Sequence, residues 1–306
     1  MSASFISALA AAHAAAADQH YPQGALYVVA TPIGNLADIS LRALHVLQIA
    51  DRVACEDTRH TQSLLRAYGI DKSGAQLLAL HQHNEEEAAQ GVVALLREGL
   101  RVAYVSDAGT PGVSDPGARL VAAVHAQGLR AIPLPGSSSV TSAISVAGIT
   151  DEAGHGFVFA GFLPNKSGER AVAVQALAEE ARAVVLLEAP HRIEAMAQAL
   201  GVLGQRKVTV GRELTKQFED VATVTCEGLV AWLEGDANRL RGEFALVLHP
   251  MPIANTTGGD TRILKLLMAE LPLKTAVKLA AEITGEPRNA LYELALSLKG
   301  NGSEGG

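Results

Sequence analysis

Residues 26–35 read LYVVATPIGN, a run of five apolar residues that passes directly into a turn containing proline and glycine. Central strands of parallel sheets are apolar throughout, because helices cover both faces of such a sheet. Beyond the turn, Leu41, Leu44 and Leu47 share one face of a predicted helix over residues 40–49. A buried strand, a tight turn and a helix in this order predict the first unit of an α/β fold.

The same alternation of short apolar runs and longer helical stretches continues along the chain. It predicts one α/β domain over residues 24–137 and a second over residues 138–252, so that the fold class is α/β. The last two strands of the second domain are expected to pair antiparallel. Further strands are predicted at 52–55, 102–105, 131–134, 157–161, 183–187, 208–210, 221–226 and 243–248, and further helices at 85–98, 118–126, 170–180 and 193–203.

The two ends of the chain depart from this pattern. Residues 1–23 are rich in alanine and contain no Lys or Arg, which disfavours a signal or transit peptide and predicts a disordered leader that is frayed or at most weakly helical. Residues 299–306 have the glycine and serine content of a flexible tail.

Residues 260–298 predict a small helical module. Its three predicted helices are residues 262–271, 273–284 and 288–298. Six basic against five acidic side chains make the segment from Asp260 to Lys299 slightly positive, in a chain whose net charge is −7. One interpretation is an RNA-docking module resembling a helix-turn-helix, in which Lys274, Lys278 and Arg288 face phosphate. The other is a helical bracket that braces the main body.

Composition excludes several classes of protein. The 306 residues are 48% hydrophobic and 19% charged, so a sizeable core is available and wholesale disorder is excluded. The net charge of −7 argues against a protein coated with positive charge for nonspecific nucleic-acid binding. No apolar run reaches the ~18–20 residues of a membrane span. Cys55 and Cys226 form no C-x-x-C pair, which fits a reducing cytoplasm, so we expect a cytoplasmic location.

Common cofactor and metal motifs are missing from the sequence. It contains no G-x-x-x-x-G-K-[ST] loop, and no G-x-G-x-x-G follows the first strand. Kinases, P-loop enzymes and ordinary dinucleotide-binding folds are therefore poor fits. His81 and His83 form the one tight histidine pair, without a carboxylate or cysteine at ligand spacing, and no metal is expected.

Glycine- and proline-containing loops recur where predicted strands end. The longest follows the strand at 102–105 and reads SDAGTPGVSDPG from Ser106 to Gly117. Glycines let backbone groups approach a ligand closely, and ligands of open α/β sheets bind beyond the carboxyl ends of the strands. Similar loops lie at residues 31–35, 135–139 and 188–192. Their recurrence predicts a composite binding site, against the alternative of purely structural turns.

Together these loops resemble the ribosomal RNA small subunit methyltransferase I family, within the tetrapyrrole-methylase superfamily. The resemblance implies S-adenosylmethionine bound in a cleft between two α/β domains, and 2′-O-methylation of a cytidine ribose in 16S ribosomal RNA of the small subunit by a homodimer. Tetrapyrrole-modifying relatives usually carry Gly-Asp-Pro where this chain has Ser106-Asp107-Ala108. The motifs are TPIGNL (31–36), EDTR (56–59), residues 106–117, PGSSS (135–139), EAPHR (188–192), GRELTK (211–216) and RGEF (241–244).

The same resemblance assigns the residues that hold the methyl donor. They come from loops of both domains and are Ile33, Ser106, Asp107, Thr110, Ser138, Ser139, Leu187, Glu188, Arg212, Glu213, Phe244 and Ala245. A carboxylate such as Asp107 suits the amino or hydroxyl groups of the donor.

Methyl transfer to a hydroxyl also needs a proton acceptor, and the sequence leaves several candidates open. Lys216, Glu188, His191, Asp57 and Glu56 lie in these motifs. A buried lysine beside Arg212 would have a lowered pKa and act as a base, whereas the alternative for Lys216 is a phosphate contact.

Basic residues near the loops are expected to clamp RNA phosphates, although ion pairs with neighbouring glutamates are the alternative for each of them. They are Arg59, Lys166, Arg170 and Arg192. Two rival functions remain at this stage. One is C-methylation of a tetrapyrrole of the uroporphyrinogen or precorrin type, and the other is a non-enzymatic role in ribosome assembly.

Overall fold

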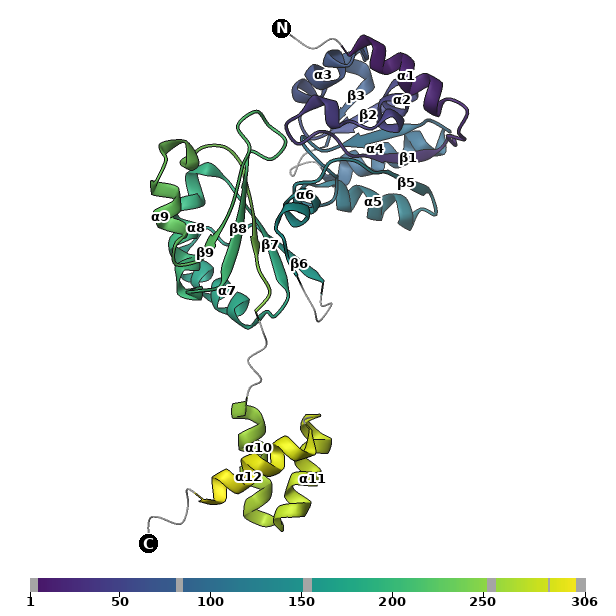
Figure 1. Cartoon of the computed structure of the whole chain (residues 1–306). Helices are drawn as coiled ribbons and strands as arrows, with labels where there is room; N and C mark the ends of the chain where they lie inside the picture. Colours follow the sequence, from purple (N-terminus) through teal and green to yellow (C-terminus); the bar gives the residue numbers. More distant parts are fainter. Residues whose placement is uncertain (1–4, 81–84, 151–155, 252–256, 286, 301–306) are drawn as a thin grey trace. The chain divides into compact units, whose positions relative to one another are not determined.

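The computed structural model describes residues 5–80, 85–150, 156–251, 257–285 and 287–300, and these form two compact units (Figure 1). The first unit is Met1–Pro250 and the second is Met251–Gly306. Both predicted α/β domains lie within the first unit, where each has its own five-stranded sheet. The mixed α/β fold with C-terminal helices is confirmed.

The first sheet is parallel throughout and has the strand order β3-β2-β4-β1-β5. The run LYVVA supplies most of β1, which pairs with β4 and β5 in the middle of the sheet. The short strand β3 was not predicted, because three residues are too few to show an alternation of apolar and polar side chains. The strands are β1 (Ala25–Val29), β2 (Arg52–Cys55), β3 (Leu77–Ala79), β4 (Val102–Val105) and β5 (Arg130–Leu134).

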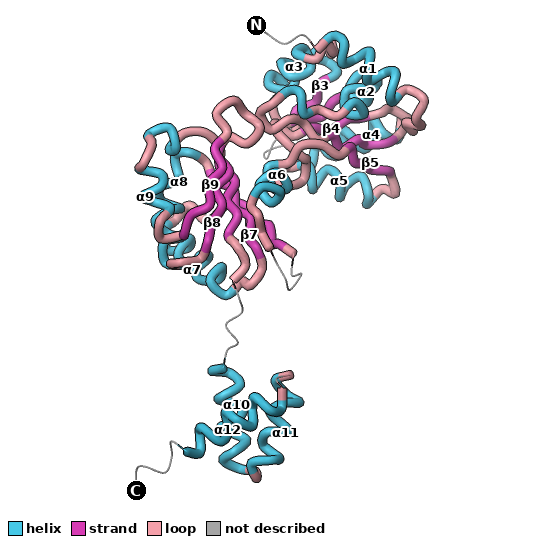
Figure 2. Tube along the Cα trace, in the orientation of Figure 1, coloured by secondary structure: helices cyan, strands magenta, loops and turns pink. Residues whose placement is uncertain are grey.

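Helices cover both faces of this sheet, as its apolar strands require (Figure 2). Tyr27 and Val29 of β1 pack in one core with Leu44 of α2, whereas Leu26 packs in a second core with Leu96 of α4. Successive side chains of a strand point to opposite faces, so one strand feeds both cores. The helices of this region are α2 (Leu41–Ile49), α3 (Thr58–Ala67), α4 (Glu85–Arg97) and α5 (Gly117–Ala126), with short 3-10 turns η1 (Leu36–Asp38) and η2 (Gly74–Gln76).

The leader is ordered from residue 5 onward, so the prediction of a disordered segment over residues 1–23 is wrong there. Helix α1 (Ile6–Ala16) packs against α2, and Ala12 is fully buried in the same core as Tyr27. Phe5 adds an edge contact with Tyr68, at 5.3 Å between ring centroids. Small alanine side chains let two helices approach closely, and because nearly every position is alanine the sequence shows no amphipathic face that would reveal the contact.

The second sheet is mixed and has the order β6-β7-β10-β8-β9. Strands β6 and β7 are parallel, whereas β10 runs antiparallel to both of its neighbours and β8 pairs antiparallel with β9. The two strands predicted to pair antiparallel, β9 and β10, do not pair with each other; each is instead antiparallel to β8, which lies between them. The strands are β6 (Phe157–Gly161), β7 (Ala183–Glu188), β8 (Lys207–Arg212), β9 (Asp220–Thr225) and β10 (Phe244–Leu248).

Helices also lie on both faces of the second sheet. Helix α6 packs on one face, where Val140 and Ala143 meet Val185 and Val247. The opposite face packs against α7, α8 and α9 in a separate core. The elements are α6 (Ser139–Val146), α7 (Ser167–Glu179), α8 (Ile193–Leu200) and α9 (Leu229–Glu234), with 3-10 turns η3 (Pro190–Arg192), η4 (Gly201–Leu203) and η5 (Ala237–Leu240).

The C-terminal unit is a three-helix arrangement with a core of its own. It contains α10 (Thr257–Glu270), α11 (Leu273–Thr284) and α12 (Arg288–Gly300). Helix α11 ends at Gly285, whose φ of 78° is the left-handed conformation that commonly terminates helices. The buried residues that the three helices share are Leu264, Val277, Ala280, Leu291 and Ala295. Within the described parts of the chain, no helix has both the length and the apolarity of a membrane span.

Candidate active site

The loops that follow the strands of the first sheet meet the edge of the second sheet at a cleft of about 440 Å³. On the second sheet, Phe244 at the start of β10 lies between Glu188 of β7 and Arg212 of β8, so three strands end at one level. The predicted composite site is therefore assembled. Of the predicted donor-binding residues, those that line the cleft are Ile33, Ser106, Asp107, Thr110, Ser138, Ser139, Leu187, Glu188, Phe244 and Ala245.

Backbone hydrogen bonds hold the first-sheet loops together. The N–H of Thr31 donates to the carbonyl of Gly109 at 2.9 Å, and the N–H of Gly109 donates back to Thr31 at 3.1 Å. The hydroxyl of Thr110 donates to the carbonyl of Ser137 at 2.9 Å. Gly109 has a φ of 83°, and a Cβ placed on it would lie 3.1 Å from Cγ2 of Ile33. Glycine at this position therefore allows three loops to converge.

Asp115 braces the far end of the long loop. Its carboxylate accepts hydrogen bonds from the hydroxyl of Tyr104 at 2.8 Å and from the N–H groups of Gly112 and Gly117, at 2.6 and 2.8 Å. A Cβ on Gly117 would lie 2.2 Å from Cε1 of Tyr104. The second aspartate of SDAGTPGVSDPG thus serves to fix the loop conformation.

Glu56 and Asp107 link the loops of two neighbouring strands. The N–H of Asp107 donates to Oε1 of Glu56 at 3.0 Å, and the N–H of Asp57 donates to Oδ1 of Asp107 at 3.3 Å. Burial raises the pKa of the Glu56 carboxyl above its usual value, with the nearby carboxylates of Asp107 and Asp115 acting in the same direction, although the Asp107 N–H opposes them. Glu56 lines the cleft and has a raised pKa, a combination that is typical of catalytic acids and bases.

Asp57, a predicted catalytic residue, caps helix α3 instead. Its carboxylate accepts hydrogen bonds from the N–H groups of Arg59, at 2.8 Å, and His60, and these bonds lower its pKa. Asp57 does not line the cleft in the part of the chain that the structure describes. The side chain of Arg59 is 92% exposed, with Asp57 3.5 Å away, so its charge faces solvent beside the cleft.

Two of the arginines predicted to bind phosphate hold the loop that follows β6. Arg192 donates to the carbonyl of Leu163, and its Nε lies 3.0 Å from Oε1 of the buried Glu188. Arg170 donates to the carbonyls of Pro164 and Asn165, at 3.4 and 3.1 Å. These guanidinium groups therefore hold the backbone of the loop after β6 in place.

The other predicted residues of these loops are exposed. Lys166 pairs with Glu169 at 3.0 Å with its side chain 81% exposed. His191 is exposed on η3 and lies outside the cleft lining within the described residues.

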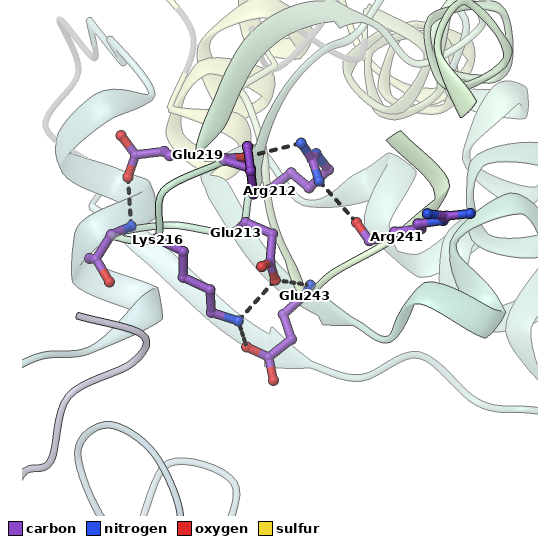
Figure 3. A network of polar contacts seen from close by, with 8 residues as sticks. Arg212, Glu213, Lys216, Glu219, Arg241 and Glu243 are labelled. Carbon is purple, nitrogen blue, oxygen red and sulfur yellow. Dashed lines mark hydrogen bonds and ion pairs between the residues drawn. The ribbon is translucent and has the colours of Figure 1, made fainter. Parts of the chain in front are cut away.

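The loop between β8 and β9 is held by charged side chains (Figure 3). The guanidinium of Arg212 donates to the carbonyls of Arg241 and Phe218, at 3.2 and 3.0 Å. Glu213 and Thr215 have φ values of 52° and 69°, which is the left-handed region that residues other than glycine rarely adopt. Arg212 and Glu213, predicted to contact the donor, brace this loop and do not line the cleft in the described structure.

Lys216 lies between two carboxylates and against the first loop. Its ammonium donates to Glu213 and Glu243, each at 2.9 Å (Figure 3). Partial burial favours the neutral form, but these two hydrogen bonds outweigh it and raise the pKa of Lys216. A protonated ammonium cannot accept a proton, so this geometry disfavours Lys216 as the base. A Cβ on Gly34 would lie 2.3 Å from Cγ of Lys216, so glycine there lets the lysine stem cross to the first sheet's loop.

The charge of the cleft lining decides which ligands fit. Among the described residues, no lysine, arginine or histidine lines it. Five carboxylates do, namely Glu56, Asp107, Asp115, Glu188 and Glu243. An acidic lining attracts cations and opposes ligands rich in phosphate. No cluster of three or more metal-ligating side chains occurs in the described ranges, and His81 and His83 lie outside them.

Comparison with known proteins identifies the class. Residues 25–230 match the family described as Tetrapyrrole (Corrin/Porphyrin) Methylases. The fold resembles that of a uroporphyrin-III-C-methyltransferase from Thermus thermophilus, with a TM-score of 0.53 and 22% identity over 78% of this chain and 98% of that one. It also resembles diphthine synthase, with a TM-score of 0.55 and 15% identity over 74% and 90%. The chain belongs to the tetrapyrrole methylase family.

Within that family the chain falls in one branch. It is 48% identical to a protein from Neisseria meningitidis serogroup A over 90% of this chain and 94% of the relative, and 45% identical to one from Escherichia coli O157:H7 over 91% and 96%. Both are named ribosomal RNA small subunit methyltransferase I. Residues 260–299 match the RsmI C-terminal HTH domain. The resemblance found in the sequence is confirmed, and the chain is a methyltransferase of this branch.

The lining suits the methyl donor of such enzymes. S-adenosylmethionine carries a sulfonium, an ammonium and one carboxylate, so its net charge is positive and an acidic lining complements it. The glycine at 109 and the turn at 31–35 provide close backbone approach. The expected cofactor therefore fits the residues present.

We expect Asp107→Asn to weaken binding of S-adenosylmethionine more than binding of S-adenosylhomocysteine. The substitution keeps the side-chain shape and removes one negative charge, and only the methylated donor carries the sulfonium. The difference should be about 1 kcal/mol, roughly fivefold in affinity, the order of one charge–charge interaction in a partly solvated site. Calorimetry with both compounds measures it. Asp71→Asn, at an exposed position outside the cleft, is the control. Equal loss for the two compounds would contradict the electrostatic assignment.

Proposed function

We propose that this enzyme transfers the methyl group of S-adenosylmethionine to the ribose 2′-hydroxyl of a cytidine in 16S ribosomal RNA, within the small ribosomal subunit. The observation that carries the proposal is similarity over about nine-tenths of the chain to relatives named ribosomal RNA small subunit methyltransferase I, including the C-terminal unit; the cytidine ribose is what the family resemblance implies. A tetrapyrrole methylase would need no such unit. We further propose that the enzyme acts in the cytoplasm as a homodimer, as the family resemblance implies.

The charge distribution limits how RNA approaches the site. Five carboxylates line the cleft, and only Glu188 and Glu243 among them form an ion pair within the described structure, so the lining disfavours RNA phosphates and a ribose is expected to enter with its phosphates at the rim. Exposed cations beside the cleft loops, Arg59 and Lys166, are suited to contact those phosphates. Arg170 and Arg192 are not expected to contact RNA, because their guanidinium groups donate to backbone carbonyls.

We propose Glu56 as the proton acceptor. The bound donor supplies an electrophilic methyl group, and the attacking hydroxyl must lose its proton. Of the five candidate bases, Glu56 and Glu188 line the cleft, and the second oxygen of Glu188 is buried away from solvent. Glu56 is partly exposed and its pKa is raised, so its carboxylate is a stronger base than an ordinary glutamate.

Glu56→Gln should lower kcat by about 10²- to 10⁴-fold, the usual contribution of a general base, while affinity for S-adenosylhomocysteine changes little. The amide oxygen of glutamine still accepts the N–H of Asp107, so the loop is retained. In the parent enzyme the rate should fall on acidification as Glu56 becomes protonated, at a pH above the ordinary glutamate pKa of 4.5 because the pKa is raised. Glu98→Gln, exposed on the same domain, is the control. Loss of product binding with kcat unchanged would exclude the assignment.

We propose that the C-terminal unit docks the enzyme on RNA. It has its own core, and Lys274, Lys278 and Arg288 are exposed on α11 and α12. Lys278 has one acidic neighbour, Glu282 at 3.9 Å, which is a weak exposed pair. An independently packed unit with exposed cations supports docking over the bracket interpretation.

A chain ending at Pro250 should lose subunit methylation while keeping its affinity for S-adenosylhomocysteine and its Tm. The triple variant Lys274→Gln, Lys278→Gln, Arg288→Gln should raise KM for the subunit without altering the fold, and should reduce the salt dependence of binding by about three phosphate contacts. Differential scanning calorimetry and steady-state kinetics distinguish the cases. A large drop in the Tm of the shortened chain would favour the bracket.

Assembled small subunits should be methylated faster than free 16S RNA. The acidic protein attracts free RNA weakly at long range, so the shape of the assembled particle must contribute to recognition. Subunits from a strain lacking the gene provide the unmethylated substrate, and mapping of ribose methylation locates the product. A cytidine that remains fully methylated in that strain would refute the proposed function, and equal rates on free RNA would refute the context requirement.

A further inference from the structure

Phe162 lies directly beyond strand β6 and lines the cleft with a side chain that is 47% exposed. Phe244 is the other aromatic residue of the described lining, and it is 3% exposed. Aromatic residues make up only 4% of this chain. Phe162 is therefore the one half-exposed ring among the described residues that line the cleft.

A β-bulge directs the chain at this point. Phe159 pairs with Val185 and Gly161 with Leu186, so Ala160 is an extra residue opposite β7. Gly161 takes a φ of 67°, which glycine adopts without strain. Bulges alter which way following side chains point, and they occur often beside active sites. Without the extra residue, the alternation of the strand would place Phe162 on the opposite face.

The loop that carries Phe162 is rigidly held. The next residue, Leu163, is buried in the core of the second sheet, and its carbonyl accepts the guanidinium of Arg192. Arg170 donates to the following two carbonyls. Ordering the loop in this way reduces the entropy that a ligand would lose on contacting the ring.

The described cleft lining contains no cation, and the two cations bonded to its carboxylates, Lys216 with Glu243 and Arg192 with Glu188, are occupied by those pairs, so the cleft is poorly suited to anchor a nucleotide through its phosphate. A face of its base is the remaining large contact. We propose that Phe162 stacks on the base of the nucleotide whose ribose enters the cleft, and so acts as a positioning residue for RNA. The inference rests on the proposed function, since it assumes an RNA substrate. Aromatic side chains commonly bind unpaired bases in this way.

The test uses the full-length enzyme and unmethylated small subunits. Phe162→Ala should lower kcat/KM for the subunit by ~5- to 150-fold, the equivalent of ~1–3 kcal/mol for a base stack at 1.4 kcal/mol per tenfold change. Phe162→Tyr and Phe162→Trp should stay within about threefold of the parent enzyme, whereas Phe162→Leu, apolar but not aromatic, should resemble alanine. Affinity for S-adenosylhomocysteine and Tm should be unchanged in all four.

Phe157→Ala provides the matched control. Phe157 begins the same strand, is 44% exposed, and lies outside the described cleft lining, so its loss should leave kcat/KM unchanged. Full activity of Phe162→Leu, or a parallel loss of S-adenosylhomocysteine affinity in Phe162→Ala, would overturn the proposal; the second outcome would assign the ring to the donor. A change in molecular mass by light scattering would assign it to a subunit contact. If the parent enzyme itself modifies no RNA, the proposed function fails instead.

Discussion

The active cleft depends on one pair of backbone hydrogen bonds, those that Thr31 and Gly109 exchange at 2.9 and 3.1 Å. They join the loop after β1 to the loop after β4, two strands that are already neighbours in the sheet. Backbone pairing of this kind does not rely on side-chain rotamers, so the positions of Ile33, Asp107 and Thr110 follow from the sheet register. On the second sheet, β7 and β8 end at the level where β10 begins, and this end of the sheet completes the cleft.

Negative and exposed positive side chains are concentrated in different parts of the enzyme. The net charge of −7 gives the protein little general attraction for RNA, yet it suits a donor that carries a sulfonium. Carboxylates gather where the donor fits, while exposed cations belong to the outer loops and the C-terminal unit. Keeping phosphate away from the cleft favours access of the proposed nucleophile, the ribose hydroxyl, and cations that are not part of the cleft lining can supply affinity without disturbing the chemistry.

Continuous apolar strands and the loops behind them were predictable from sequence, because parallel strands buried on both faces leave an unmistakable pattern. Of the ten cleft-lining residues predicted for the donor, five lie on such loops, Ser139 begins α6, and the other four lie on β7 and β10; the five loop residues are Ile33, Ser106, Asp107, Thr110 and Ser138. The contacts of charged side chains were predicted less accurately than the strands and loops. Nothing in the sequence reveals that Arg170 and Arg192 meet carbonyls, or that Lys216 lies between Glu213 and Glu243, because these contacts depend on which loops become neighbours. The exposure of Phe162 depends on a register shift between two strands, which no single-strand pattern records.

The contact between Gly34 and the stem of Lys216 has a consequence for how this protein can vary. No side chain fits at residue 34 unless the lysine stem moves, and a shift of the stem would disturb the hydrogen bonds from its ammonium to two carboxylates, one of which lines the cleft. A substitution in the loop of the first sheet would therefore change the electrostatics of the second. The effects of substitutions at residue 34 and at Lys216 should therefore depend on each other, although the two residues belong to different sheets.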